Sequence, residues 1–224
     1  MPGQKFLTSG CGASHMTAVC LLLLLTVVSA GFLAVSLSSF SENADPLSET
    51  YHARIRVDEI RGGLSSGSSP VRFKDNIIIL KHEGGDPVPP EAVSVIFRGT
   101  GNAYHGIPGT AGSRMLTGNI EIIYENLGRS GKNSEYASRN NDVLADGLWS
   151  AGEIIILTGN DSVTGSVRSA GGSGIRVSVD GEADTSCNFG LKNGTSCRYD
   201  IIIRQNGRAA VLAEGEISVR DISS

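Results

Sequence analysis

Three side chains able to bind a metal or transfer protons lie close together in the stretch KHEGGDPVPP, residues 81 to 90. They are His82, Glu83 and Asp86. A metal site would need their ligand atoms to converge with at least one further donor. Two of the three are adjacent, and adjacent side chains on an extended chain point to opposite faces. A shared metal or acid–base site is therefore not favoured.

The rest of the same stretch is typical of a turn. Gly84 and Gly85 permit positive φ angles, Asp86 favours an Asx-type hydrogen bond, and Pro87 fixes its own φ. We predict a structural turn here, with no metal ion and no cofactor.

Nucleophilic catalysis is not indicated elsewhere in the chain. The four histidines, at positions 15, 52, 82 and 105, are scattered, and no Gly-x-Ser-x-Gly sequence leads into a predicted helix. We do not expect an enzyme.

Composition narrows the class of protein further. The chain has 224 residues, 29 of them glycine, and a net charge of −4. No basic stripe is available to neutralise phosphates, so we expect no nucleic-acid partner. The high glycine content and the modest 19% of charged residues favour a β domain rich in loops over a helical bundle.

The segment from Met16 to Phe40 carries no charged residue. As a helix its 25 residues would span about 37 Å, enough to cross a bilayer core. Lys5 precedes it, whereas Glu42, Asp45 and Glu49 follow it. This asymmetry predicts an N-terminus on the cytoplasmic side of the membrane and a body on the outer side.

Three interpretations of this segment remain open. It is a secretory signal peptide cleaved after Val28-Ser29-Ala30, a permanent anchor, or a helix that is retained after removal of a short leader and later enters an assembly. All three interpretations place the body of the protein outside the cytoplasm.

A location outside the cytoplasm would permit disulfide bonds between cysteines and glycosylation of asparagines. Cys187 and Cys197 frame a short loop without histidine or further cysteine, so we predict a disulfide between them. Asn160 and Asn193 each begin an Asn-x-Ser/Thr triplet and are possible N-glycosylation sites.

The body of the chain has the pattern of short strands. Residues 53–60 alternate apolar and polar side chains, and Ile-Ile-Ile triplets at 77–79, 154–156 and 201–203 fit central strands buried on both faces. Residues 126–147 form either a long loop or a short helix around 137–146. Further strands are expected at 92–97, 120–124, 175–179 and 210–219.

These elements predict a long N-terminal hydrophobic α-helix followed by an all-β head, an antiparallel β-sandwich or barrel. We divide the chain into a leader at 1–12, the hydrophobic assembly or transmembrane helix at 13–41, a linker at 42–52 and the head at 53–224.

The sequence resembles the archaeal type IV pilin family at three places. IIILKHEGGDPVPPEAVSVIFRG, residues 77 to 99, is similar to a family strand that leads into a turn. LWSAGEIIILTG, at 148–159, and YDIIIRQNGRAAVLAEGEISV, at 199–219, are similar to a later strand and to the closing hairpin. The family turn motif corresponds here to His82, Glu83, Gly84, Gly85, Asp86 and Pro87.

The resemblance implies a structural subunit of an extracellular filament. It implies leader cleavage by a prepilin peptidase, either between Gly10 and Cys11 or, as we favour, between Gly12 and Ala13. It also implies insertion in the membrane before assembly, and a homo-oligomer built by pilus assembly machinery. Only Lys5 provides the basic character that the family's leaders usually have, so this sequence departs from the pattern there. Helix–helix assembly would use Ala18, Leu22, Leu23, Leu25, Ala30, Gly31 and Ala34. The alternative is an anchored or secreted monomeric β-sandwich that binds a glycan or another partner.

Overall fold

A computed structural model describes residues 18–20, 22–23, 51–62, 73–106, 110–162, 174–183, 185–205 and 208–221. The chain divides into two compact units, Met1–Thr50 and Tyr51–Ser224. The second unit, called the head below, holds all the strands of the described chain.

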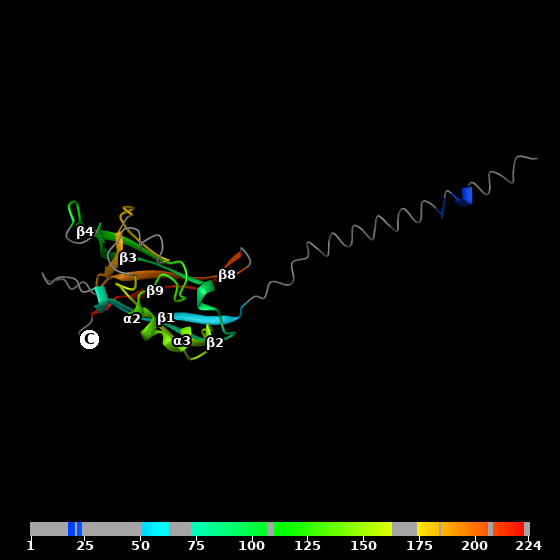
Figure 1. Cartoon of the computed structure of the whole chain (residues 1–224), viewed down its shortest axis with the longest axis horizontal. Helices are drawn as coiled ribbons and strands as arrows, with labels where there is room; N and C mark the ends of the chain where they lie inside the picture. The colour runs from blue at the N-terminus through cyan, green and yellow to red at the C-terminus, as the bar shows by residue number, and fades with distance from the viewer. Residues whose placement is uncertain are drawn as a thin grey trace, which may run out of the picture. The chain divides into compact units, whose positions relative to one another are not determined.

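Two sheets form the head (Figure 1). The four-stranded sheet has the order β10-β1-β2-β5, and the six-stranded sheet has the order β6-β4-β3-β8-β9, with β7 also paired to β3. Neighbouring strands are antiparallel except for β1 and β10. The strands are β1 (Ala53–Gly62), β2 (Ile77–Gly85), β3 (Val93–His105), β4 (Arg114–Tyr124), β5 (Ile154–Thr158), β6 (Ile175–Val179), β7 (Thr185–Leu191), β8 (Ser196–Gln205), β9 (Arg208–Ser218) and β10 (Arg220–Asp221).

The helices are short and connect the strands. They are η1 (Phe73–Asp75), η2 (Pro90–Ala92), α2 (Ser134–Arg139) and α3 (Asn141–Asp146). The helices α2 and α3 answer the question left open for residues 126–147: the segment contains two short helices, and the first begins at Ser134, earlier than the predicted 137. Asn133 caps α2 by accepting a hydrogen bond from the Tyr136 N–H at 2.9 Å.

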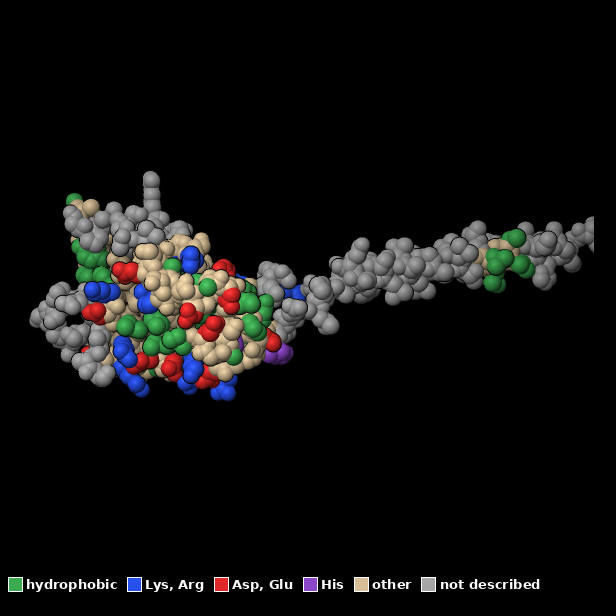
Figure 2. Space-filling view, turned by 60° about the horizontal axis from the view of Figure 1, so that its bottom comes forward, with side chains coloured by type: hydrophobic (Ala, Val, Ile, Leu, Met, Phe, Trp, Pro, Cys, Tyr) green, Lys and Arg blue, Asp and Glu red, His purple; other side chains and the backbone are tan. Residues whose placement is uncertain are grey.

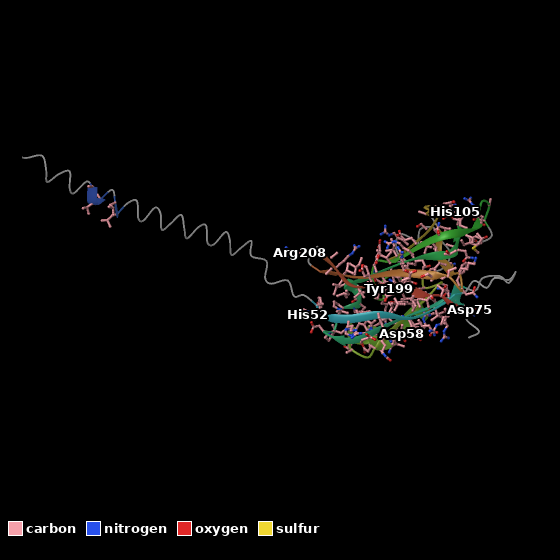
Figure 3. The ribbon with its side chains drawn as sticks, turned by 180° about the vertical axis from the view of Figure 1, so that it is seen from behind. His52, Asp58, Asp75, His105, Tyr199 and Arg208 are labelled. Carbon is pink, nitrogen blue, oxygen red and sulfur yellow. The ribbon has the colours of Figure 1, made fainter. Side chains whose placement is uncertain are left out.

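The core lies between the two sheets and combines side chains from both. Ile78 and Leu80 of β2 and Phe97 of β3 are completely buried, as are Tyr124 and Trp149. The two sheets are consistent with the all-β head that the sequence predicts. Figure 3 shows its two ends, with His52 and Arg208 at one and Asp75 and His105 at the other.

A β-bulge in β1 explains why its hydrophobic pattern breaks. Ile55 and Val57 alternate into the core, but the next core residue is Ile60, three positions later. The pairing with β2 shifts between Val57 and Glu59, which leaves Asp58 unpaired. The extra residue returns Ile60 to the buried face.

The second isoleucine triplet lies at a sheet edge, so its prediction as a central strand is wrong. Strand β5 pairs only with β2 among the described strands. Its other side is covered by residues 134–146, which contain α2 and α3 and are called the helical insertion below. There Asn140 binds both backbone groups of Ile156. Ile156 N–H donates to Asn140 Oδ1 at 2.7 Å, and Asn140 Nδ2 donates to the Ile156 carbonyl at 3.0 Å. A side-chain amide here replaces a neighbouring strand and protects the edge.

A buried ion pair fixes the insertion to the end of β5. Asp161 lies in the turn that follows β5, its side chain is inaccessible to solvent, and it pairs with Arg139 of α2. Its carboxylate also accepts hydrogen bonds from the Thr158 N–H at 2.7 Å and from the Thr158 hydroxyl at 2.6 Å. Burial raises the pKa of the Asp161 carboxyl, although Arg139 opposes that effect.

The predicted long N-terminal helix is not observed. In that region the structure describes helical turns only at 18–20 and 22–23, and no helix within the described ranges is long and apolar enough to span a bilayer. The side chains of Val19, Leu22 and Leu23 are 46%, 66% and 59% exposed. A helix in water is stabilised mainly by burial of one face, and these exposed side chains gain little from burial.

Candidate functional site

The predicted turn begins later than expected: His82, Glu83, Gly84 and Gly85 belong to strand β2, and the chain leaves the strand at Asp86. His82 is fully buried, its Nε2 lies 3.0 Å from the Asp86 carbonyl oxygen, and its ring meets the edge of Trp149 with 6.0 Å between centroids. Val88 and Trp149 form an isolated antiparallel bridge beside it. The motif thus guides the chain from β2 in one sheet toward β3 in the other.

The three polar side chains of the motif diverge. Glu83 pairs with Arg54 at 2.8 Å and with Arg56 at 2.9 Å, whereas Asp86 accepts the His52 backbone N–H at 3.0 Å. No group of three or more potential metal ligands occurs among the residues that the structure describes.

Only one of the two glycines of the motif adopts a positive φ. Gly85 has a φ of +95°, and a Cβ there would lie 1.7 Å from the His52 carbonyl oxygen. Gly84 has no atom within 4 Å of the equivalent position. The close approach of β1 to the turn therefore requires glycine at 85 alone.

The predicted disulfide is wrong, because Cys197 is a free, buried cysteine. Cys197 lies beside Gly99 of β3, while β7 places Phe189 opposite Ala103 and Thr185 opposite His105. Cys187 therefore lies about five residues farther along β3, roughly 16 Å away. A disulfide needs Cα atoms within about 7 Å. Burial raises the pKa of the Cys197 thiol to about 12.

The two glycosylation triplets lie in different surroundings. Asn160 Oδ1 accepts the Thr158 hydroxyl at 2.9 Å, and Ser162 of its triplet is fully buried. Asn193 lies in the turn between β7 and β8, where its Nδ2 donates to Asp221 at 3.0 Å. Glycosylation at both positions stays a prediction, with access favouring Asn193.

The residues predicted for leader cleavage and assembly are described in part. Ala18, Leu22 and Leu23 are helical and exposed. The other predicted residues lie outside the described residues; they are Gly12, Ala13, Leu25, Ala30, Gly31 and Ala34.

The best candidate for a binding site is a groove of about 570 Å³ on the six-stranded sheet. Arg98 of β3 lines the groove and is held between two neighbouring strands. Its Nε donates to Glu121 of β4 at 2.8 Å, and its Nη1 donates to Asp200 of β8 at 2.6 Å. These cross-strand pairs raise the pKa of Arg98 and hold the guanidinium in place.

A tight turn builds one wall of the groove. Asp180 follows β6 with a φ of +50°, which is uncommon for a residue other than glycine. Its Oδ1 accepts both the backbone N–H and the side-chain amide of Asn119, each at 3.0 Å. Gly118 leaves room for this carboxylate, since a Cβ there would lie 1.9 Å from Asp180 Oδ2.

A second hollow of about 510 Å³ adjoins the groove and shares Arg98. It adds Arg198 and the carboxylates of Asp200, Glu214 and Glu216. Together the two hollows contain five carboxylates and two arginines, which leaves an acidic surface. Figure 2 shows another face of the head, where basic and acidic side chains are intermingled.

The groove carries groups that can bind a ligand. Its residues offer carboxylate acceptors, serine hydroxyls and one fixed guanidinium, a set that fits a ligand rich in hydroxyl groups or positive charge. No histidine belongs to the described lining, and its central carboxylates are paired with Arg98.

Sequence reasoning missed this groove because its parts lie far apart in the chain. Arg98 and Asp200 are separated by 102 positions and meet only through the pairing of β3 with β8. The available signal is the recurrence of charged residues at outward positions of the predicted strands.

Comparisons with protein-family models, curated proteins and solved structures give no match.

Proposed function

We propose that the chain is a structural subunit of an extracellular, type IV pilus-like filament. In this proposal the apolar segment 16–40 holds the subunits together and the β head faces the surroundings. The subunit is inserted in the membrane before assembly, and a prepilin peptidase removes the leader between Gly12 and Ala13. Pilus assembly machinery then adds copies of the chain to the growing filament.

One observation carries the proposal. The segment of 25 uncharged residues precedes a head that completes its own core, since every core residue of the described chain lies between Ile55 and Val219. In the proposal the segment packs against the same segment of other copies. Burying a leucine side chain contributes about 1.5–3 kcal/mol, and a filament repeats that contribution at every subunit.

Leu23→Asp tests the proposal. A carboxylate inside an apolar assembly is costly to desolvate, so we expect filaments to disappear from sheared cell surfaces in negative-stain microscopy. Leu148→Asp is the matched control, because Leu148 is a 42% exposed leucine of the head. It should leave filaments intact. Filaments that persist with Leu23→Asp would refute the assembly role of the segment.

The second candidate is an anchored or secreted monomeric head that binds a glycan or another partner. The acidic groove around Arg98 supports it, because it offers acceptors for hydroxyl groups. The mature N-terminus distinguishes the candidates. A start at Ala13 favours the filament, a start at Gly31 favours ordinary secretion, and an intact Met1 favours a permanent anchor.

A further inference from the structure

Lys132 is a buried lysine in the loop between β4 and α2, with only 7% of its surface exposed. Its Nζ donates to Asn126 Oδ1 at 3.2 Å and to the Ser130 carbonyl at 3.4 Å. The Nζ also lies 5.7 Å from the centre of the Tyr136 ring. Lysines are rarely buried without a charged partner, and the hydrogen-bond partners here are neutral.

The buried environment of Lys132 makes its amine a nucleophile. Burial lowers the pKa of Lys132 to about 8, and the more distant charges of Asp161 and Glu125 only partly oppose the effect. About one molecule in ten then carries a neutral amine at pH 7. A neutral lysine amine attacks carbonyl carbon atoms, whereas the ammonium ion does not.

The carboxamide of Asn126 is the carbonyl group within reach. Because a C=O bond is about 1.2 Å long, Asn126 Cγ lies no farther than about 4.4 Å from Lys132 Nζ. Reacting atoms are typically about 3–3.5 Å apart before attack, so a small movement of either side chain is sufficient.

Gly174 leaves the space that this pair occupies. A Cβ at position 174 would lie 2.9 Å from Asn126 Nδ2 and 3.5 Å from Lys132 Nζ. The Gly174 carbonyl also accepts the Glu125 N–H at 2.7 Å, which fixes the backbone next to Asn126. The amine, the carboxamide and the glycine thus form one compact arrangement.

We propose that Lys132 Nζ and Asn126 Cγ join in an intramolecular amide bond that forms after the head has folded. The neutral amine attacks Cγ, and the Cγ–Nδ2 bond breaks. The attacking nitrogen loses one proton and the leaving nitrogen gains one, so that ammonia departs. The chain loses one ammonia molecule, and no oxidant, reductant or other reactant is consumed.

The bond closes residues 126 to 132 into a ring that contains Arg129, an exposed residue. A protease that cuts after Arg129 would no longer divide the chain, because the amide bond still connects the two pieces. For a head outside the cell this protects the loop that leads into the helical insertion. The inference concerns the head alone and does not depend on filament assembly.

Mass spectrometry of the intact, folded chain tests the proposal. We expect the wild type to be lighter than its sequence by the mass of one ammonia, and we expect Lys132→Met and Asn126→Ala to have their full sequence masses. Lys74→Met replaces an exposed lysine and should still show the loss. A wild-type chain at its full sequence mass would overturn the proposal.

A peptide map locates the bond without any variant. Cleavage after Arg114, Arg129 and Arg139 should give residues 115–129 and 130–139 as one joined product. An Asn-Gly pair such as Asn193-Gly194 can also lose ammonia by cyclising with its own backbone. That loss would persist in Lys132→Met and would give two separate peptides, and this result would also overturn the proposal.

Discussion

Replacing Arg139 with methionine should reveal how strongly the buried ion pair holds the helical insertion. Arg139 is the cationic partner of Asp161, whose side chain is fully buried. The substitution keeps the length and apolar bulk of the side chain but leaves the carboxylate without its counter-charge. Removing one member of a buried pair typically costs about 3–5 kcal/mol.

The cost can be converted into a melting temperature. In a domain of this size 1 kcal/mol corresponds to about 2–4 °C, so Arg139→Met should lower the melting temperature by roughly 10 °C. Adding Asp161→Asn removes the uncompensated charge and keeps an acceptor for the Thr158 N–H. The double variant should therefore recover at least half of the lost stability.

The dependence of the head's stability on pH tests the same ion pair independently. The pKa of Asp161 is raised in the head above its usual value of 3.8, so between these two values the folded state binds more protons than the unfolded state. The stabilisation that Asp161 gains from binding its proton is therefore complete below pH 3.8, and it is lost as the pH rises through the pKa of the folded state. In Arg139→Met the folded pKa rises further, so the loss of stability should extend to higher pH.

Thermal unfolding followed by circular dichroism measures these effects, with Arg176→Met as the control. Arg176 pairs with Glu125 at 2.9 Å, but both side chains are largely exposed, so its loss should cost less than about 1 kcal/mol. If Arg139→Met costs no more than Arg176→Met, the ion pair does not hold the insertion.

Two further predictions concern the turn and the free cysteine. Gly85→Ala should lower the free energy of unfolding by at least about 2 kcal/mol, because φ is positive and the new Cβ would meet His52, whereas Gly84→Ala should cost less than about 1 kcal/mol; equal effects in urea unfolding would contradict the assigned geometry. In the folded chain a thiol reagent should label Cys20, which is exposed, and spare Cys197 until denaturant is added; a peptide joining Cys187 to Cys197 would contradict the free thiol.

Much of the head could be predicted because strand patterns are local. The isoleucine triplets marked β2, β5 and β8. The glycine, aspartate and proline residues after His82 marked only the end of β2, because both glycines still pair with β1. The sequence could not show that β5 lies at an edge. That position depends on Asn140, which reaches Ile156 from an insertion 16 residues away.

The disulfide prediction failed because loop length is not the same as spatial distance. Cys187 and Cys197 are close in sequence, but β7 and β8 pair with different parts of β3. The groove around Arg98 was missed for a related reason, since strand order decides which outward charges become neighbours.

The head and the apolar segment offer different contributions to association. Arg98 already has two carboxylate partners in its own chain, so a neighbouring molecule would have to replace these bonds to gain from that charge. Such exposed charges influence orientation and choice of partner more than affinity. In the proposed filament the association energy must therefore come mainly from apolar burial by residues 16–40. The head then has to remain folded outside the cell by itself, which is the property that its enclosed core, the covered edge of β5 and the buried Arg139–Asp161 pair provide.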